Sequence, residues 1–441
     1  MTTPTQSQQK VLQEVQDFLL QTKEKELIIT GPSGSGKSFI VKTLMNQWDN
    51  LRKLFKLFNL KFYSGWYISA TTNKAASIYK NASTIHSLLN LRLKNDLNTG
   101  NTYLEETSNT RYTINSLNNC VIFIDECSMI NEELYSYLSQ ILNNKRVKLI
   151  YIGDKNQLPP VNSKFSIFNL GIKQVELEEP VRYKDKDLKE LADILKSNIE
   201  TGLFNPIHIP INSSTLYWLN ADDFQKEVDN YFKEYCPDNK ILAYTNEQVN
   251  AYNNYIQALR NSKAYLIKDR NYILNTAFNG SDLKNRLIKL NIPSGTEVTI
   301  TNISRTKKSK QREEQILLTT KIKVPLVELT FALNGTLSTV IATTDPVAIK
   351  QAIKVVANAK KWPLYFFFRD EILNLSPGDA LTVHKSQGST YKNVFIDLND
   401  ICSCRKENEL QRLLYVACTR ASEKVFLCGT IPHKFGGIYK S

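Results

Sequence analysis

The segment Gly31-Pro32-Ser33-Gly34-Ser35-Gly36-Lys37-Ser38 constrains the fold of this chain more than any other feature. It fits the pattern G-x-x-x-x-G-K-[ST], in which glycines let successive backbone N–H groups turn inward around phosphate oxygens. An apolar run at residues 27–30 precedes it, and apolar residues at helical spacing follow: Phe39, Ile40, Leu44, Met45 and Trp48. Strand, loop and helix in this order predict a phosphate-binding loop at the edge of an α/β sheet.

The loop predicts ATP and Mg²⁺ as cofactors. Lys37 would reach the β- and γ-phosphates, and Ser38 would hold Mg²⁺ through its hydroxyl. The remaining residues would surround the phosphates: Gly31, Pro32, Ser33, Gly34, Ser35 and Gly36. The alternative is a Gly/Ser-rich turn without a ligand, which the flanking strand and helix disfavour. The loop indicates a nucleotide but does not identify the reaction.

Two carboxylates and a glutamine follow later strands of the predicted sheet. Asp125 and Glu126 end the apolar run 121–124, and Gln157 follows the run 148–152. Ligands of open α/β sheets bind at the carboxyl ends of the strands, so Asp125 would hold Mg²⁺ through water and Glu126 would accept the proton of an attacking water. Gln157, in Gly153-Asp-Lys-Asn-Gln-Leu-Pro-Pro, would sense the γ-phosphate. Taken singly, these residues also fit a solvated strand end and a loop ended by proline.

Length and charge limit the classes of protein. A chain of 441 residues is expected to form two to four domains. A formal net charge of +13 favours a polyanionic partner, although solubility alone would also explain it. No apolar run approaches the roughly 20 residues of a membrane helix. The seven Cys are scattered without CxxC spacing, which favours reduced thiols in a cytoplasmic compartment.

The second half predicts another α/β region with an insertion. Short apolar runs at 241–245, 380–383, 394–398 and 425–428 indicate strands. The interruption at about 261–377 has alternating runs at 297–303, 315–320, 327–332 and 337–343, followed by a helix with Asp345 as N-cap and Pro346 at its first position. We interpret it as an inserted β module. A polar, Asn- and Thr-rich stretch between residues 89 and 117 predicts a projecting hairpin.

Two more motifs complete a pattern. They are His384-Lys385-Ser386-Gln387-Gly388 and Val416-Ala417-Cys418-Thr419-Arg420. Together with the phosphate loop, Asp125-Glu126 and the Gln157 segment, they resemble helicases of superfamily 1, most closely the RecD/Dda-like branch (superfamily 1B). The motifs extend from residue 8 to residue 421 in the family's order.

The resemblance implies a domain plan. Two RecA-like domains with parallel sheets would lie at 1–180 and at 181–260 with 376–441. A pin hairpin would be inserted at 89–117, and an SH3-like module with a helix at 261–375. ATP would bind between the RecA-like domains.

The resemblance also implies roles for single residues. Arg420 and Arg182 would be arginine fingers, and Gly388 would lie at the nucleotide. Gln9 would read adenine, with Gln6 and Gln8 as alternatives. Contacts with the nucleic-acid strand would come from Thr71, Thr72, Thr84, His86, Thr382, His384 and Ser389, and from Tyr103 (or Tyr112) on the pin. Each hydroxyl could instead cap a strand or helix end.

The expected function is ATP-dependent 5′-to-3′ translocation on single-stranded DNA with unwinding of duplex DNA. The alternatives are a superfamily 1 RNA helicase, a translocase or nucleoprotein remodeller without unwinding, and a nucleotide-binding switch. Expected partners are single-stranded DNA, single-strand/duplex junctions, and a single-strand-binding or replication protein. We expect a monomer in the cytoplasm, or in the host cytoplasm or nucleoid if the source is a virus. Residues 51–60 have no assigned role, and the basic run 305–312 fits either phosphate contact or a solvated turn.

Overall fold

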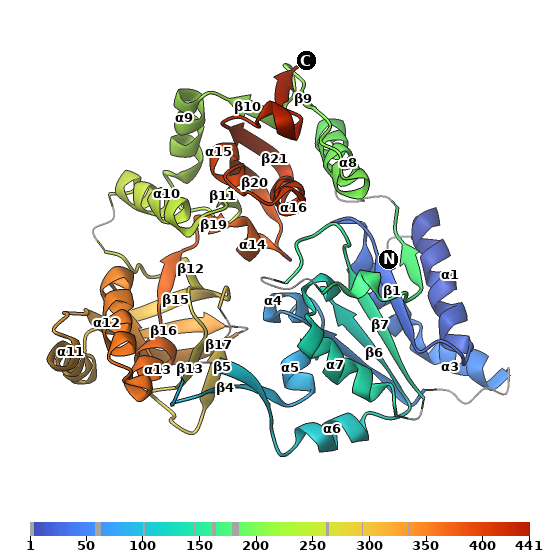
Figure 1. Cartoon of the computed structure of the whole chain (residues 1–441), viewed down its shortest axis with the longest axis horizontal. Coiled ribbons are helices and arrows are strands. Elements are labelled where there is room, and N and C mark those ends of the chain that lie inside the picture. The colour runs from blue at the N-terminus through green and yellow to red at the C-terminus, as the bar shows by residue number, and fades with distance from the viewer. Residues whose placement is uncertain are drawn as a thin grey trace.

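The computed structural model describes residues 4–57, 63–99, 102–144, 146–160, 165–178, 185–261, 264–292, 294–333 and 335–441. The chain forms three bodies, which lie at the right, top and left of Figure 1. We call them the first lobe (residues 4–178), the second lobe (residues 185–260 and 379–441) and the module (residues 264–377). None of the described helices combines the length and apolar character needed to cross a bilayer.

The first lobe is built on a six-stranded sheet in the order β3-β2-β6-β7-β1-β8. Every neighbouring pair is parallel. The central strands are apolar on both faces, as expected for a sheet covered by helices on both sides. The strands are β1 (Glu26–Thr30), β2 (Gly65–Ala70), β3 (Ser83–Thr84), β6 (Cys120–Asp125), β7 (Val147–Gly153) and β8 (Gln174–Glu176). The runs expected at 27–30, 121–124 and 148–152 are therefore strands.

Helices α1 and α7 of the first lobe begin at polar capping residues. Thr5 forms a capping box with Gln8 at the start of α1, and Asn131 caps α7 by accepting from the Leu134 N–H. The helices are α1 (Gln6–Leu20), α2 (Lys37–Asn46), α3 (Trp48–Leu57), α4 (Asn73–Ala76), α5 (Ile85–Leu88), α6 (Thr110–Ser116), α7 (Glu132–Ile141), η1 (Cys127–Met129) and η2 (Ile167–Asn169).

The unassigned stretch 51–60 belongs to α3 as far as residue 57; residues 58–60 lie outside the described residues. Trp48, Leu51 and Phe55 are buried at helical spacing in the core of the first lobe. This part of the stretch is therefore structural.

The hairpin is shorter than the expected 89–117. Strands β4 (Leu91–Asn95) and β5 (Thr102–Glu106) pair antiparallel, and residues 110–116 form α6 instead. Thr110 begins that helix and is fully buried, with its hydroxyl donating to the Asn90 carbonyl at 2.8 Å. Figure 1 shows the hairpin reaching from the first lobe toward the module.

The second lobe repeats the parallel architecture. Its five-stranded sheet has the order β10-β21-β20-β11-β19, with all neighbouring pairs parallel. The strands are β10 (Leu216–Leu219), β11 (Asn239–Ala243), β19 (Ala380–Thr382), β20 (Tyr391–Asp397) and β21 (Ala421–Cys428), with a separate pair β9 (Ile207–Ile209) and β22 (Ile438–Lys440). The helices are α8 (Lys186–Thr201), α9 (Ala221–Phe232), α10 (Asn246–Leu259), α14 (Val383–Ser386), α15 (Leu398–Ile401), α16 (Glu407–Cys418) and η3 (His433–Phe435).

The module is an antiparallel sheet covered by helices. Its strand order is β17-β16-β15-β12-β18, and β18 ends two residues beyond the expected boundary at 375. The strands are β12 (Asn271–Leu274), β15 (Glu297–Ser304), β16 (Leu326–Leu333), β17 (Thr336–Thr343) and β18 (Leu375–Pro377), with the pair β13 (Phe278–Ser281) and β14 (Lys289–Ile292). The helices are α11 (Lys307–Thr320), α12 (Pro346–Asn358) and α13 (Trp362–Asp370). The boundary expected at 180 lies outside the described residues.

One strand prediction in the module is wrong. Residues 315–320 are the last part of helix α11, and the basic run 305–312 leads into its first half rather than forming a turn. The segment is rich in Lys, Arg, Gln and Glu, which favour helix, and its buried Ile316 and Thr320 are four residues apart. The next helix agrees with the sequence: Asp345 caps α12, accepting from the Val347 and Ala348 N–H groups, and Pro346 occupies the first turn.

A buried ion pair joins two parts of the second lobe that the module separates in sequence. Arg260 donates from both terminal nitrogens to Asp379, at 2.9 and 3.0 Å, and its Nε donates to the Phe232 carbonyl at 2.7 Å. The side chains of Arg260 and Asp379 are only 3% and 6% exposed. The pair therefore connects the end of α10 with the start of β19.

We predict that Asp379→Ala destabilises the protein by about 3–5 kcal/mol, because it leaves the Arg260 charge buried and unpaired. Differential scanning calorimetry measures this as a lowered transition of the second lobe. The control is Asp223→Ala, which removes the exposed partner of Lys226 and should change the transition much less. Equal shifts for the two variants would contradict the predicted importance of the buried pair.

Candidate nucleotide site and nucleic-acid interface

The phosphate loop joins β1 to α2 and has the backbone that its sequence predicts. Gly34 and Gly36 have φ values of +80° and +91°, a region that side chains disfavour. A Cβ on Gly31 would lie 2.8 Å from the Leu177 Cβ, so this position also has no room for a side chain. The Lys37 ammonium donates to the carbonyls of Gly31 and Pro32 at 2.7 and 2.8 Å. The Lys37 ammonium thus lies over the loop in which the phosphates would bind.

The donor groups at this loop fit a triphosphate with a magnesium ion. The Ser35 hydroxyl is buried and has no partner among the described residues. The loop opens at the N-terminus of α2, where free N–H groups favour an anion. Ser38 and Asp125 supply the hard oxygen ligands that Mg²⁺ prefers. When bound, the metal would neutralise charge on the phosphates.

Asp125 lies at the end of β6, where both of its carboxylate oxygens accept hydrogen bonds. Oδ2 accepts from the Tyr79 phenol at 2.6 Å, and Oδ1 accepts from the Glu126 N–H at 2.8 Å. Burial raises the pKa of Asp125 above its ordinary value, and these two hydrogen bonds oppose the rise. Two donors thereby orient the carboxylate.

Glu126 occupies a strained position next to Asp125. Its φ of 54° lies in the left-handed region, which is uncommon for a residue with a long side chain. Desolvation and the neighbouring Asp125 charge raise its pKa to about 7, while Lys37 and Arg420 lower it. A carboxylate that titrates near neutrality suits a general base.

Arg420 and Gly388 bring the second lobe close to the Glu126 carboxylate. A Cβ on Gly388 would lie 3.3 Å from Glu126 Oε1, so the glycine faces this carboxylate directly. Arg420 is 1% exposed and donates to the carbonyls of Val416 and Ser389 at 3.1 and 3.2 Å. Its charge lowers the pKa of Glu126 from across the cleft. The site is therefore composed of residues from both lobes.

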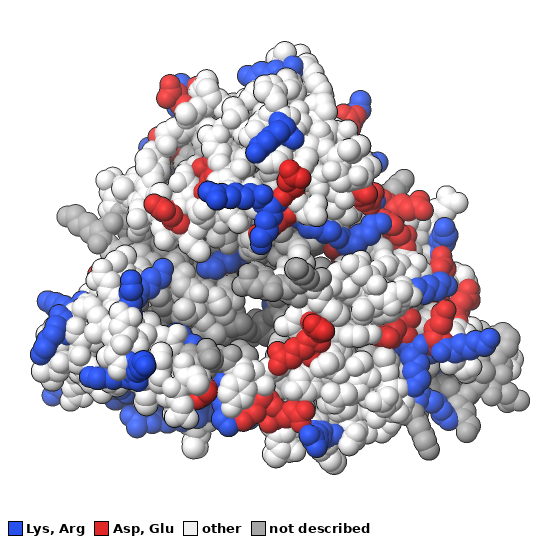
Figure 2. Space-filling model, viewed as in Figure 1, with Lys and Arg blue, Asp and Glu red and all other residues white. Residues whose placement is uncertain are grey.

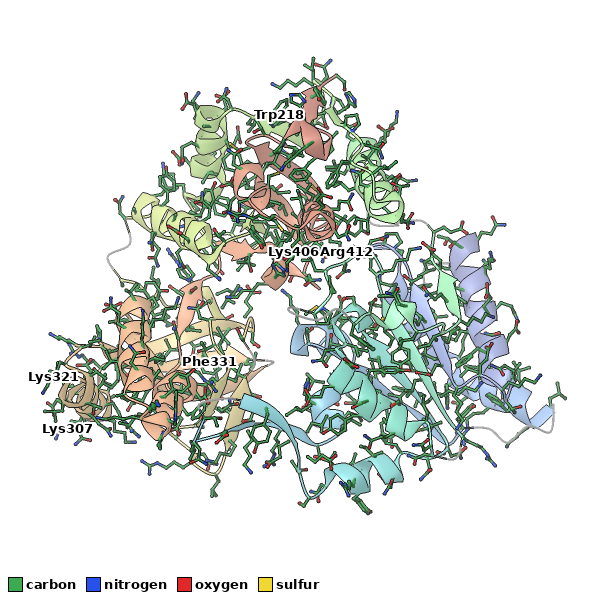
Figure 3. All side chains as sticks on the ribbon, in the orientation of Figure 1. Trp218, Lys307, Lys321, Phe331, Lys406 and Arg412 are labelled. Atoms are coloured by element: carbon green, nitrogen blue, oxygen red, sulfur yellow. The ribbon has the colours of Figure 1, made fainter. Side chains whose placement is uncertain are left out.

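Helix α16 contacts the loop that carries Gln157. Arg412 donates to the carbonyls of Lys155 and Gln157 at 2.5 and 2.7 Å, and Tyr415 donates to Asp154 at 2.9 Å. Arg412 lies at the edge of the second lobe that faces the first lobe (Figure 3). A cavity of about 530 Å³ opens beside this contact. The Gln157 side-chain oxygen is buried without a partner among the described residues, so it can accept a new hydrogen bond.

Gln8, rather than Gln9, reaches the phosphate loop. Its amide donates to the Ser35 carbonyl at 3.2 Å, whereas Gln9 is exposed and donates to the Pro4 carbonyl at 3.1 Å. Gln8 shares a helix face with the buried Val11 and Val15, three and seven residues later. The sequence alone shows this spacing, which distinguishes Gln8, on the buried face of the helix, from the exposed Gln9. Arg182 lies outside the described residues.

The hydroxyls expected to contact the strand make local hydrogen bonds. Thr84 and Thr382 cap α5 and α14 by accepting from the N–H groups of Ser87 and Lys385, both at 3.3 Å. Thr72 accepts from the Ala75 N–H at 3.2 Å, and Thr71 donates to the Glu126 carbonyl at 3.0 Å. In this structure Thr84 and Thr382 therefore cap helices, as the alternative interpretation expects. A strand contact by these residues stays a prediction.

The remaining expected strand contacts differ in accessibility. Ser389 is 3% exposed, lies beneath the surface, and its carbonyl accepts from Arg420. His86 and His384 are partly buried, and burial lowers the pKa of both imidazoles. Tyr103 is 46% exposed on the hairpin. Tyr112, the alternative to Tyr103, lies on α6 and is 76% exposed, so both tyrosines present an open aromatic face.

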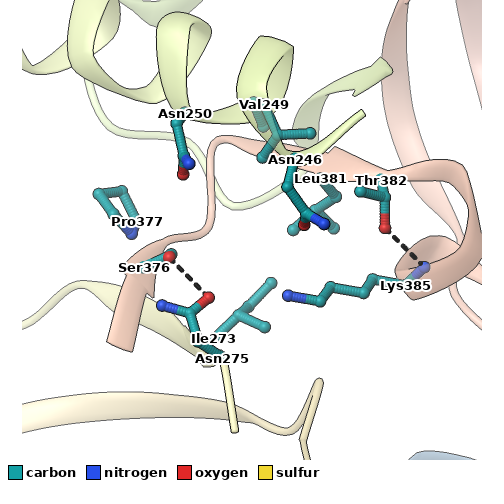
Figure 4. A pocket seen from close by; sticks show the side chains of 11 residues that line it. Asn246, Val249, Asn250, Ile273, Asn275, Ser376, Pro377, Leu381, Thr382 and Lys385 are labelled. Atoms are coloured by element: carbon teal, nitrogen blue, oxygen red, sulfur yellow. Dashed lines mark hydrogen bonds between the residues drawn. The ribbon is translucent and has the colours of Figure 1, made fainter. Parts of the chain in front are cut away.

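A small cavity lies where the second lobe meets the module, next to Thr382. Figure 4 shows the Lys385 side chain extending toward Ile273 and Asn275 of the module, with Asn246 and Asn250 on the opposite side. The cavity has a volume of about 20 Å³, enough for about one water molecule. Lys385, whose pKa is lowered by burial, was not among the expected site residues.

Several residues of the site have no local signal in the sequence. Tyr79 precedes Asp125 by 46 residues, and Arg412 follows Gln157 by 255. Their contacts arise only when strands and lobes come together. Arg412 and Tyr415 share one face of α16 and precede Arg420 by eight and five residues. This spacing is the one indication of their role in the sequence.

Two protein-family models match the chain. Residues 16–163 match the model of an AAA domain, and residues 377–428 match that of a UvrD-like helicase C-terminal domain. The first range contains Lys37, Glu126 and Gln157, and the second contains Gly388 and Arg420. The chain is therefore similar to an AAA domain over most of its first lobe and to a UvrD-like helicase C-terminal domain over part of its second lobe.

Related proteins are distant. An uncharacterized protein of Acanthamoeba polyphaga mimivirus is 25% identical over an alignment of 497 residues, gaps included. The alignment covers 95% of this chain and 98% of that protein. An uncharacterized protein of Methanocaldococcus jannaschii is 29% identical over 192 residues, covering 39% of this chain and 15% of that protein.

The chain resembles solved helicase structures. The Pif1 helicase from Bacteroides in complex with ADP-AlF3 and ssDNA is 16% identical, with a TM-score of 0.51, covering 99% of this chain and 94% of that chain. The Pif1 helicase from Candida albicans is 19% identical, with a TM-score of 0.46 and coverage of 99% and 97%. The likeness to the Bacteroides protein confirms the expected α/β fold with two RecA-like domains and parallel sheets.

We predict that the pH dependence of hydrolysis reports Glu126. A general base must be ionised, so kcat/KM for ATP should rise about tenfold per pH unit below pH 7 and level off above it, because the Glu126 pKa is about 7. Initial rates between pH 5.5 and 8.5 measure this. At the ordinary Glu value of 4.5 the profile would be flat above pH 6, and that result would contradict the assignment.

Proposed function

We propose that this chain is an ATP-driven DNA helicase that moves 5′-to-3′ along single-stranded DNA and unwinds duplex DNA. The observation that carries the proposal is the composite site, in which Lys37 and Glu126 of the first lobe face Arg420 and Gly388 of the second. A site divided between two lobes is completed only when they close, so hydrolysis is tied to their relative position.

Each residue of the proposed site has a separate role in ATP hydrolysis. Lys37 holds the β- and γ-phosphates, while Ser38 and Asp125 hold the magnesium ion, which supplies charge neutralisation. Glu126 accepts a proton from the attacking water, and Gln157 orients that water or the γ-phosphate. Arg420, together with Arg182, stabilises charge on the phosphoryl oxygens. Gln8 is better placed than Gln9 to meet the base of the nucleotide, because its amide already lies at the phosphate loop.

The DNA strand is proposed to cross both lobes. In the first lobe Thr71 and Thr72 directly follow β2, Thr84 is the last residue of β3 and His86 lies in α5. In the second lobe Thr382 is the last residue of β19 and His384 lies in α14. Phosphate contacts of this kind do not depend on base sequence. Figure 2 shows Lys and Arg side chains gathered on the module, which adds positive potential for a polyanion. The 5′-to-3′ polarity and the RecD/Dda-like branch rest on the motif resemblance.

The setting of the protein is also a proposal. All seven cysteines are free, which fits a reducing compartment such as the cytoplasm of a host cell. The mimivirus relative supports a viral setting. We propose a monomer that acts at single-strand/duplex junctions, with a single-strand-binding or replication protein as a partner.

The experiment is strand displacement with ATP on partial duplexes carrying a 5′ or a 3′ single-stranded tail, made with DNA or RNA tails. Unwinding from the 5′ DNA tail alone supports the full proposal. Unwinding from the 3′ tail would overturn the polarity, and preference for an RNA tail would overturn the substrate. Hydrolysis stimulated by DNA without any unwinding would indicate a translocase.

We predict that Arg420→Lys separates nucleotide binding from turnover. Lysine keeps the charge but cannot reproduce the planar set of donors, so strand-stimulated turnover should fall about 10³-fold while nucleotide affinity stays within about threefold. Arg405→Lys, at an exposed position, is the matched control. A loss of nucleotide affinity together with a lower melting temperature would instead assign Arg420 a structural role.

We predict that shortening the hairpin abolishes unwinding but keeps DNA-stimulated hydrolysis. Leu93 and Leu104 lie opposite each other, so residues 94–103 can be replaced by the two-residue turn Asn-Gly. This removes the exposed Leu97 and Tyr103, of which Tyr103 is proposed to stack on the terminal base pair. It spares the buried start of α6, which a wider deletion would destroy. Unwinding at the wild-type rate would show that this hairpin is not the pin.

A further inference from the structure

Tyr79 lies in the segment that joins β2 to α5 and contacts the metal-binding carboxylate. Its phenol is the donor of the 2.6 Å hydrogen bond to Asp125 Oδ2, and the side chain is only 5% exposed. Burial and the Asp125 charge raise the pKa of Tyr79, so the phenol stays protonated and donates to the carboxylate.

The same segment is connected to the catalytic pair at a second point. The Thr71 N–H donates to the Asp125 carbonyl at 3.3 Å, and the Thr71 hydroxyl donates to the Glu126 carbonyl at 3.0 Å. Residues 71–86 thus contact the end of β6 at two points. Thr71 bonds to its main chain, and Tyr79 bonds to the Asp125 side chain. This segment also carries Thr72, Thr84 and His86, the first-lobe residues proposed to meet the DNA strand.

We infer that Tyr79 is a positioning residue that couples strand binding on residues 71–86 to the magnesium-binding carboxylate Asp125. The inference rests on the proposed function, because it assumes that residues 71–86 meet the strand. A shift of this segment on DNA binding moves the phenol, and the phenol sets the orientation of Asp125. Binding of the strand and of the magnesium–nucleotide complex then affect each other reciprocally.

The Tyr79 hydroxyl and ring make different contacts, so a substitution can remove the hydroxyl and keep the ring. The aromatic ring packs in the core of the first lobe and has the Lys42 ammonium 5.8 Å from its centre. Tyr79→Phe keeps this packing and removes only the donor. It leaves one oxygen of a buried carboxylate without its charge-assisted hydrogen bond, which weakens the hold on the metal.

The test measures the affinity of a fluorescent ADP over a magnesium titration, with and without single-stranded oligothymidylate. For Tyr79→Phe we expect the magnesium midpoint to rise about tenfold, the effect of losing one charged hydrogen bond. The strand-dependent change in ADP affinity should fall at least about threefold. Affinity without magnesium should stay at the wild-type value, which a merely misfolded variant would not show.

The matched control is Tyr67→Phe, on the neighbouring strand β2, where the side chain is 45% exposed. It should keep the wild-type midpoint and the wild-type strand effect. If Tyr79→Phe behaves like Tyr67→Phe, the coupling role is overturned while the helicase proposal stands. If the wild-type protein shows no strand effect on ADP affinity, both the coupling and the proposed function fail together.

Discussion

The contact of helix α16 with the loop after β7 is the interaction on which the rest of the site depends. Arg412 and Tyr415 hold the backbone and side chain of residues 154–157 by hydrogen bonds between the lobes. The same helix leads directly to Arg420, whose charge acts on Glu126. If α16 moved away, Gln157 would lose its anchor and Glu126 its opposite charge at the same moment. One rigid element thus acts on two of the residues that we propose to carry out hydrolysis.

This arrangement also agrees with the local hydrogen bonds made by the residues that we propose to face the strand. A segment that must report its position needs to be rigid, and caps such as those of Thr84 and Thr382 fix the ends of short helices. Thr71 connects this segment to the end of β6 through its hydrogen bond to the Glu126 carbonyl. Capping and strand contact are therefore compatible roles, because a capped helix end still presents backbone N–H groups to a phosphate.

The sequence was informative where chemistry is local. The apolar runs that became β1, β6 and β7 could be located, and the phosphate loop could be placed between β1 and α2, because each signal lies within a few residues. Helix α11 was missed at residues 315–320, because short alternating runs fit both strand and helix. The resemblance predicts Gln9 at the base, whereas helical spacing places Gln8 on the buried face with Val11 and Val15. Tyr79 and Arg412 could not be found, because their contacts depend on how distant segments pack.

The central claim is that the nucleotide site is assembled from two lobes that move relative to each other on the strand. Fluorescence energy transfer between dyes at the exposed Lys10 on α1 and Asp222 on α9, with single-stranded DNA bound, measures this most directly. The account predicts a shorter distance with a non-hydrolysable ATP analogue than with ADP, and a longer one without nucleotide. An unchanged distance in all three states, in a protein that still hydrolyses ATP, would contradict it.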